Sequence, residues 1–246
     1  MKPSKEPKKP GKNLRPTTNA DTGMPCNNGT NKLDWLVMDR RNYRPELIII
    51  AGPNGSGKTT VTRQFLHHEW SEGVLYINPD QVAEEKFEGW NNRDAILKAA
   101  KYCTELREKC LNEHKSFVFE TVFSAQDKID FLMRAKAAGF FIRLFFIGTS
   151  SPTINASRIA KRVIEGGHDV PITKIISRYQ KSMINCRLIS CVVDRLYVYD
   201  NSIDDHVAQI LFRLSNGTLA KQYVHQLPKW AANILKQTEA DTEQLF

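Results

Sequence analysis

Hydrophobic and polar residues alternate along the chain in blocks whose period switches between that of a strand and that of a helix. Short apolar runs, each followed by a turn and an amphipathic stretch, are typical of buried strands joined by helices. The predicted strands span residues 46–51, 73–78, 116–121, 140–148, 195–201 and 207–217. The predicted helices span residues 58–70, 93–114, 125–139, 151–167, 171–190 and 228–237. This order predicts an α/β fold with a mostly parallel sheet between layers of helices.

The first 44 residues differ in composition from the rest of the chain. They are rich in Pro, Lys, Asn, Thr and Gly, a composition that buries too little apolar surface to fold by itself. They also carry a net charge of +6 out of the +8 of the whole chain. We therefore predict a flexible basic leader over residues 1–44 and one globular domain over residues 45–246. The domain keeps a net charge of only +2, so a nucleic-acid partner is not expected.

The apolar runs and the cysteines bear on location. No run is long enough to span a membrane, and the charged N-terminus lacks the apolar segment of a signal peptide. The five cysteines are odd in number and form no CxxC pair, which is typical of reduced thiols. These features predict a cytoplasmic protein without membrane contact.

A glycine-rich loop, GPNGSGKTT, follows the first predicted strand and opens the first predicted helix. Its spacing fits G-x-x-x-x-G-K-[ST], the phosphate-binding loop (P-loop) of nucleotide-binding proteins. Glycines let backbone N–H groups approach phosphate oxygens, and the helix N-terminus adds its dipole. We expect Lys58 to reach the β- and γ-phosphates and the Thr59 hydroxyl to bind Mg²⁺. The predicted nucleotide-binding residues are Gly52, Pro53, Asn54, Gly55, Ser56, Gly57, Lys58, Thr59 and Thr60. The loop alone leaves a kinase, an ATPase, a GTPase and a nucleotide-gated switch open.

Two carboxylates stand at the ends of predicted strands. Asp80 follows the second strand closely, and Glu120 lies near the end of the third. Because ligands of open α/β sheets bind beyond the carboxyl ends of the strands, either carboxylate could accept a proton from an attacking hydroxyl or hold Mg²⁺. The alternatives are a helix N-cap for Asp80 and a buried structural carboxylate for Glu120.

Basic residues gather on the helix predicted over residues 151–167. Arg158 and Arg162 are four residues apart and precede the Gly166–Gly167 pair. Two cations on a mobile element suit phosphoryl transfer, where negative charge spreads over the transferring group. An exposed basic helix is the alternative, and it applies equally to Arg178 on the next helix.

The motifs IAGPNGSGKTT, INPD, FVFETVFS, FIGTSSP and GGHDVP stand in an order that resembles the zeta-toxin family of P-loop kinases. The resemblance covers about residues 45–201. It implies a three-layer α/β/α P-loop fold with a small helical lid. It also implies a kinase that uses ATP or GTP with Mg²⁺ to phosphorylate a sugar hydroxyl of a nucleotide sugar such as UDP-N-acetylglucosamine. Such an enzyme is expected to act as a toxin with a separate antitoxin protein.

The resemblance assigns a role to each candidate. It implies Asp80 as general base and, with Thr59, as metal ligand, and it implies Arg162 and Arg158 as the lid arginines that act with Lys58. The residues expected to bind the acceptor substrate are Glu120, Thr121, His168 and Arg178. His168 stands roughly where the family toxins carry a second lid arginine, a departure that changes the charge of the lid.

Two other functions remain open at this stage. A polynucleotide 5′-hydroxyl kinase would have the same fold but is disfavoured by the nearly neutral domain. A non-catalytic nucleotide switch would need the P-loop but not Asp80, Glu120 and the arginines together.

Overall fold

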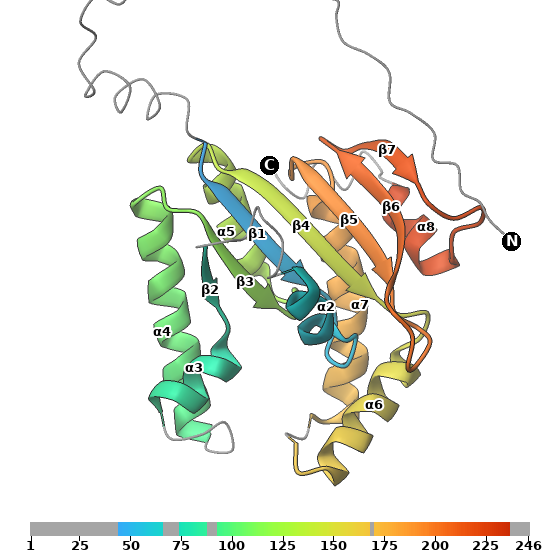
Figure 1. Cartoon of the computed structure of the whole chain (residues 1–246), viewed down its shortest axis with the longest axis horizontal. Coiled ribbons are helices and arrows are strands. Elements are labelled where there is room, and N and C mark those ends of the chain that lie inside the picture. The colour runs from blue at the N-terminus through green and yellow to red at the C-terminus, as the bar shows by residue number, and fades with distance from the viewer. Residues whose placement is uncertain (1–43, 66–73, 88–92, 168–169, 237–246) are drawn as a thin grey trace, which may run out of the picture. The chain divides into compact units, whose positions relative to one another are not determined.

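The computed structural model describes residues 44–65, 74–87, 93–167 and 170–236. At its centre lies one seven-stranded sheet in the order β2-β3-β1-β4-β5-β6-β7 (Figure 1). The strands are β1 (Glu46–Ala51), β2 (Leu75–Ile77), β3 (Phe117–Thr121), β4 (Phe141–Gly148), β5 (Arg195–Asp200), β6 (Gln209–Ser215) and β7 (Thr218–Gln222). Residues 1–43 of the predicted leader lie outside the described residues, so its flexibility and its boundary with the domain stay predictions.

The sheet is mostly parallel, as predicted. Strands β2, β3, β1, β4 and β5 pair in parallel, whereas β6 and β7 add an antiparallel ribbon at one edge. The strand β1 lies between β3 and β4, where the order of the chain through the sheet reverses. Such a reversal point opens a ligand crevice at the carboxyl ends of the strands, which is where the P-loop begins.

Seven helices accompany the sheet in the described part of the chain: α2 (Lys58–Phe65), α3 (Pro79–Lys86), α4 (Arg93–Asn112), α5 (Gln126–Ala137), α6 (Pro152–Ile164), α7 (Ile172–Ile189) and α8 (Lys229–Leu235). The hydrophobic pattern had not predicted α3 or β7. Only Ala83 of α3 is buried, and every residue of β7 is exposed, so neither element carries an apolar pattern. None of the described helices combines the length and the apolar character needed to cross a membrane.

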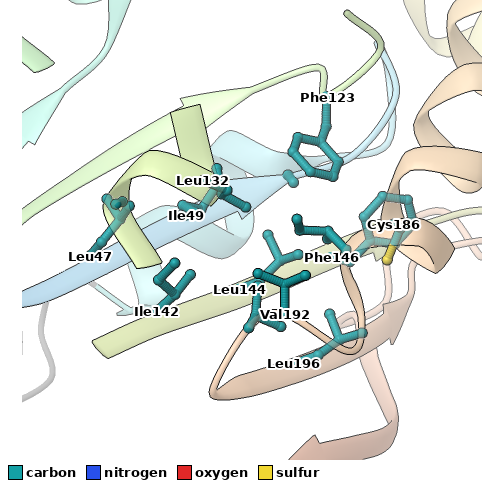
Figure 2. Packing of buried hydrophobic residues seen from close by; sticks show 14 of the residues in the cluster. Leu47, Ile49, Phe123, Leu132, Ile142, Leu144, Phe146, Cys186, Val192 and Leu196 are labelled. Atoms are coloured by element: carbon teal, nitrogen blue, oxygen red, sulfur yellow. The ribbon is translucent and has the colours of Figure 1, made fainter. Parts of the chain in front are cut away.

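The strand β1 is buried on both faces, which explains its unbroken apolar run. Leu47 and Ile49 point into the larger core, whose other members come from α4, α5, α7, α8, the strands and loop residues such as Phe123 and Val192 (Figure 2). Ile48 and Ile50 point to the opposite face, where they pack with Val61 of α2. Helices therefore cover both faces of the sheet, and this central strand delivers the P-loop from a rigid position.

The helix α6 and the N-terminal half of α7 project beyond the sheet and are called the lid below, whereas the C-terminal half of α7 packs in the larger core (Figure 1). Ile159, Val170 and Ile175 make up the lid's own small apolar cluster. At the base of the lid, the buried Tyr179 hydroxyl donates a hydrogen bond of 2.6 Å to the carbonyl oxygen of Thr149. The lid therefore has a local core near its tip and a polar attachment at its base.

A buried carboxylate stabilises the end of the sheet opposite the P-loop. Asp194 accepts a hydrogen bond from the Ile142 N–H at 2.8 Å and forms ion pairs with Arg44 at 3.1 Å and Lys136 at 3.0 Å. Burial by itself raises the pKa of this carboxyl, but the Ile142 hydrogen bond and the two cations outweigh that effect and hold the pKa below its usual value. The ionised form is therefore the one that the fold stabilises.

Replacing Asp194 should destabilise the fold without touching the site. Asp194→Ala leaves the buried Ile142 N–H without its acceptor, so we expect the free energy of unfolding to fall by about 2 kcal/mol at pH 7 in urea titrations. The exposed Glu105, 3.9 Å from Lys101, supplies the control, because Glu105→Ala should change stability little. Since the pKa of Asp194 is lowered in the fold, its contribution should disappear as the pH falls below about 4. Equal stability of Asp194→Ala and Glu105→Ala at pH 7 would contradict this account.

Candidate active site

A cleft of about 1000 Å³ opens beyond the carboxyl ends of the parallel strands. Its floor is formed by the P-loop and α2, one wall by α3 and α4, and the other wall by the lid. The lining residues are Asn54, Thr59, Thr62, Arg63, Tyr76, Asn78, Asp80, Gln81, Glu84, Ile96, Arg162, Glu165, Gly166, Gly167, Val170 and Arg178. Of the residues predicted from the sequence, the cleft brings together Asn54, Thr59, Asp80, Arg162 and Arg178.

The P-loop has the conformation that its glycines predict. Gly55 and Gly57 have φ angles of 76° and 86°, which favour glycine over other residues. A Cβ atom on Gly57 would lie 2.2 Å from Nδ2 of Asn201, and one on Gly55 would lie 2.6 Å from the carbonyl oxygen of Asn155. Both glycines are therefore required by close neighbours as well as by backbone conformation.

The P-loop carbonyl groups are hydrogen-bonded by donors from several elements. Each of the four consecutive carbonyls of residues 53–56 accepts a side-chain hydrogen bond. The donors are Lys58 Nζ to Pro53 at 3.0 Å, Asn155 Nδ2 to Asn54 at 2.6 Å, Arg158 to Gly55 at 3.5 Å and Asn201 Nδ2 to Ser56 at 2.9 Å. A loop held by its carbonyls in this way leaves N–H groups to form an anion-binding nest. The buried Ser56 hydroxyl, which has no hydrogen-bond partner among the described residues, adds a further polar group to the loop.

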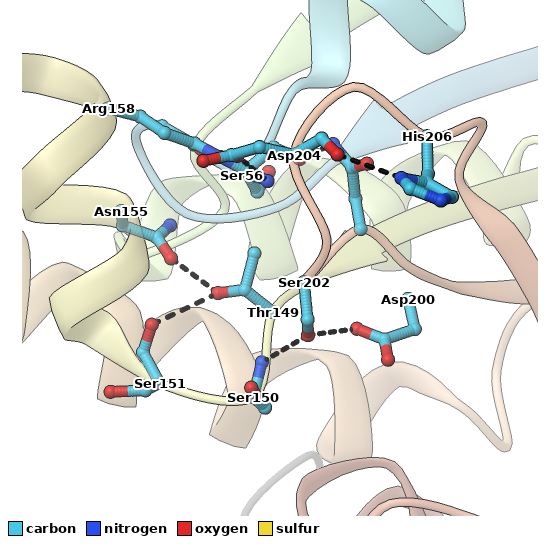
Figure 3. Close-up of polar contacts among 12 residues, drawn as sticks. Ser56, Thr149, Ser150, Ser151, Asn155, Arg158, Asp200, Ser202, Asp204 and His206 are labelled. Carbon is cyan, nitrogen blue, oxygen red and sulfur yellow. Dashed lines mark hydrogen bonds and ion pairs between the residues drawn. The ribbon is translucent and has the colours of Figure 1, made fainter. Parts of the chain in front are cut away.

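The helix α6 contributes two of these donors, Asn155 and Arg158, and Figure 3 shows Asn155 with its hydrogen bond to Thr149 and Arg158 beside Asp204. Asn155 is wholly buried and accepts a hydrogen bond from the Thr149 hydroxyl while its amide holds the P-loop. Arg158 forms an ion pair with Asp204, at 2.7 Å from Nε and 2.6 Å from the terminal nitrogen. The sequence predicts Arg158 and Arg162 as a pair, but only Arg162 lines the cleft. Arg158 lies against the P-loop instead.

Lys58 lies in a charged but partly desolvated environment. Burial lowers its pKa to about 8, and Arg162 adds to this effect, whereas the carboxylates of Glu120 and Asp80 oppose it. The ammonium group donates to the Pro53 carbonyl at 3.0 Å. Lys58 is therefore poised to gain a full charge when an anion approaches.

Glu120 is surrounded by hydroxyl groups. Its Oε1 accepts hydrogen bonds from Thr62 at 2.5 Å and from Tyr76 at 2.6 Å. The Thr59 hydroxyl lies 3.4 Å from Oε2, longer than an ordinary O–H···O bond. Burial, followed by the charge of Glu120, raises the pKa of Tyr76 well above its ordinary value. Glu120 therefore organises the cleft floor, while the exposed Thr59 hydroxyl stays only loosely held.

Asp80 is exposed in the cleft, and the alternative that it caps α3 is wrong. The N-cap is Asn78, whose Oδ1 accepts the Asp80 N–H at 2.9 Å. Asp80 itself lies in the first turn of the helix, where its charge is favoured by the helix dipole. Its carboxylate lines the cleft, and no described residue donates it a hydrogen bond that would mark it as the cap.

The remaining residues predicted from the sequence lie in different surroundings. Arg178 donates to Oδ1 of Asn54 at 3.3 Å and so connects α7 to the P-loop. The Thr121 hydroxyl accepts the Phe123 N–H at 3.2 Å, and Thr60 is exposed on α2. His168 lies outside the described residues. Substrate contacts for Glu120, Thr121, His168 and Arg178 stay predictions.

A divalent cation would need few protein ligands here. Among the described residues, no group of three or more His, Cys, Asp or Glu side chains could hold a metal ion. Mg²⁺ next to phosphates usually takes one or two protein oxygens and keeps several waters. The loosely held Thr59 hydroxyl and the exposed Asp80 carboxylate suit that role.

The sequence did not reveal several residues that hold the site, namely Thr62, Tyr76, Asn78, Asn155 and Asn201. Asn201 directly follows β5, so the rule that picked out Asp80 and Glu120 at strand ends could have found it. Thr62 lies one helical turn after Thr59, a spacing that puts both on one face of α2. Asn155 gave no such signal, because its partner lies 101 residues away.

The lowered pKa of Lys58 predicts that nucleotide binding takes up a proton above about pH 8. Phosphate favours the charged ammonium, so a lysine that is largely neutral at pH 8.5–9 should be protonated on binding ATP. Calorimetric titrations in buffers of different ionisation enthalpy should show this uptake at pH 9 and little of it at pH 6.5. Lys58→Arg, which stays charged, is the matched control and should take up none at this position. Equal proton uptake by both proteins at pH 9 would contradict the assignment.

Comparison with known proteins identifies the family. The family model for zeta toxin matches residues 34–208. An uncharacterised protein of Haemophilus influenzae is 31% identical over 145 residues, which are 59% of this chain and 96% of that protein. Among solved structures, one of the PezAT chromosomal toxin–antitoxin system of Streptococcus pneumoniae matches with a TM-score of 0.53 at 16% identity, over 88% of this chain and 98% of that one.

A structure of AvrRxo1-ORF1 with ORF2 and ATP matches with a TM-score of 0.54 at 14% identity, over 82% of this chain. The chain covers 65% of the length of that protein. At these identities the structural matches establish the fold alone, whereas the family model covers most of the chain. The chain therefore belongs to the zeta toxin family.

Proposed function

We propose that the protein is a small-molecule kinase that transfers the γ-phosphoryl group of ATP or GTP to a sugar hydroxyl of a nucleotide sugar such as UDP-N-acetylglucosamine. We further propose that it acts as the toxin of a toxin–antitoxin pair. The observation that carries the proposal is the single cleft that joins the P-loop, Asp80 and Arg162. The zeta toxin family, the toxin–antitoxin context of the PezAT structure and the ATP of the AvrRxo1-ORF1 structure support it.

The P-loop residues would hold the nucleotide phosphates. The N–H groups of the loop and the Lys58 ammonium would neutralise phosphate charge, and the Thr59 hydroxyl with Asp80 would hold Mg²⁺. When bound, Mg²⁺ would neutralise charge on the β- and γ-phosphates. Arg162, on the facing wall, would stabilise the charge that develops on the transferring group. Arg158 would act through the P-loop, because it contacts the Gly55 carbonyl and Asp204.

The wall opposite the lid would receive the acceptor. Asp80, Gln81 and Glu84 line this wall, so it offers carboxylate and amide groups to a hydroxyl-rich molecule. Asp80 would take the proton as the O–H bond of the acceptor breaks and its oxygen bonds to phosphorus. The bond from phosphorus to the bridging oxygen then breaks, and the nucleoside diphosphate leaves with that electron pair.

The charges of the cleft weigh against a polynucleotide acceptor. A 5′-hydroxyl at the end of a nucleic acid would bring several phosphates past Asp80, Glu84 and Glu165. Kinases of nucleic acids need basic grooves for such a backbone. The cations Arg63, Arg162 and Arg178 suit instead the few phosphates of a nucleoside triphosphate and a nucleotide-sugar acceptor.

An acceptor panel tests the proposal directly. The protein should be incubated with Mg²⁺, ATP or GTP, and in turn UDP-N-acetylglucosamine, other nucleotide sugars and a 5′-hydroxyl oligonucleotide. We expect mass spectrometry to find one added phosphate on a nucleotide sugar, and none with folded Lys58→Ala. Transfer only to the oligonucleotide would overturn the proposed substrate class. Nucleotide binding without transfer to any acceptor would favour the switch.

Replacing Asp80 separates a catalytic from a structural role. Asp80→Asn keeps the size of the side chain but removes the basic oxygen, so transfer at saturating ATP should fall about 10²–10⁴-fold while ATP still binds. Asp127, also in the first turn of its helix, is the matched control for the loss of a charge near a helix N-terminus. Asp127→Asn should keep wild-type turnover. Near-wild-type transfer by Asp80→Asn would exclude Asp80 as general base.

A further inference from the structure

We infer that Tyr76 and Asn78 are positioning residues that hold Asp80 at a fixed place relative to the P-loop helix. The observation is a continuous series of hydrogen bonds between α2 and the first turn of α3. The Thr62 and Tyr76 hydroxyls both donate to Oε1 of Glu120, at 2.5 Å and 2.6 Å. Asn78 Nδ2 donates to the Tyr76 hydroxyl at 2.8 Å, and Asn78 Oδ1 accepts the Asp80 N–H at 2.9 Å. The inference rests on the proposed function, in which Asp80 is the general base.

The directions of these bonds make the series self-consistent. Tyr76 has one proton, which goes to Glu120, so its oxygen is left to accept from Asn78. The Asn78 amide then has its NH₂ end fixed toward Tyr76 and its oxygen end fixed toward the α3 backbone. An isolated N-cap could rotate, whereas this amide is held at both ends. The orientation of the first turn of α3 is therefore set by Glu120, which also contacts α2.

The helix α3 packs on α4, and these contacts do not connect it directly to the P-loop helix. Ala83 is the only buried residue of the helix, and the helix is eight residues long. Its wall of the cleft must nevertheless place Asp80 within reach of a phosphate on the P-loop. An error of about 1 Å in such a position can lower a rate about 10²-fold. A polar connection to α2 fixes α3 relative to the phosphate-binding loop, which its packing on α4 does not do directly.

Tyr76→Phe is the first variant, because it removes one oxygen and breaks the connection at its centre. We expect the turnover number to fall about 10- to 100-fold at saturating substrates, with the affinity for ATP unchanged. Tyr197→Phe is the matched control. The Tyr197 hydroxyl, in the middle of β5, accepts a hydrogen bond from Arg143 at 3.2 Å and is not part of the connection to α3. It should keep wild-type turnover. Wild-type turnover by Tyr76→Phe would overturn the inference.

A second variant separates positioning from simple helix capping. Asn78→Ser keeps a good N-cap but cannot reach the Tyr76 hydroxyl. If the connection matters, Asn78→Ser should lose turnover to about the same degree as Tyr76→Phe. Full turnover by Asn78→Ser would reduce Asn78 to a cap and overturn its part in the connection.

A double-mutant cycle tests whether Tyr76 acts through Asp80. In the Asp80→Asn background, Tyr76→Phe should have little further effect on turnover, because the group that it positions is already lost. An equal fold-loss in both backgrounds would show that Tyr76 acts elsewhere and would overturn the inference.

Hydrogen–deuterium exchange makes the outcome independent of the reaction. Tyr76→Phe should speed exchange in the peptide that covers residues 78–84 relative to wild type, whereas Tyr197→Phe should not. Faster exchange together with a wild type that transfers phosphate to no acceptor would overturn the proposed function but keep the connection. Unchanged exchange in Tyr76→Phe would overturn the connection, whatever the protein phosphorylates.

Discussion

The site depends on one constraint of the backbone, which is that the peptide groups of the P-loop have carbonyl acceptors, and all but that of Pro53 have N–H donors, to satisfy. A loop that offers its N–H groups to an anion must find other partners for its carbonyls, because unpaired buried carbonyls are costly. Here the carbonyls of residues 53–56 receive Lys58, Asn155, Arg158 and Asn201. The shape of the loop is therefore set by side chains from α2, α6 and the end of β5 as well as by its glycines.

The same bonds connect the P-loop with the lid. Asn155 and Arg158 lie on α6, and Arg178 of α7 reaches the Asn54 side chain. Each half of the lid thus has a direct polar contact with the loop, while the lid's own apolar cluster is small. A lid built this way is held at its base, so any closure would come from the part nearer Gly166 and Gly167. Arg162 lies on that part of α6, so closure would move its positive charge toward the transferring phosphate.

Much of this arrangement could be predicted from the sequence, because its signals are local. The P-loop spacing, the apolar run of β1 and the carboxylates at strand ends each depend on a few neighbouring residues. The polar network could not be predicted from the sequence, because its partners lie far apart in the chain. Tyr76 and Glu120 are 44 residues apart, and Asn201 and Ser56 are 145 residues apart. The structure also rejects the N-cap alternative for Asp80, because the cap is Asn78, two residues earlier, whose side chain accepts the Asp80 N–H. Helix α3 and strand β7 were not predicted for a different reason, which is that neither buries an apolar stripe.

The two walls of the cleft divide the electrostatic work of the proposed reaction. The lid wall and floor carry Arg162, Arg178 and Arg63 together with one carboxylate, Glu165, and the α3 wall carries the carboxylates Asp80 and Glu84. An entering phosphate is attracted to these cations, which favour its binding against the P-loop. A neutral hydroxyl is not repelled by α3 and can bond to its carboxylates. In the proposed reaction the cations would hold the nucleotide phosphates against the P-loop, and the neutral hydroxyl of the acceptor would approach Asp80 from the α3 side. The proposed function requires the exposed Asp80 to keep its place in the cleft, and the connection of α3 through Asn78 and Tyr76 to Glu120 would serve that need.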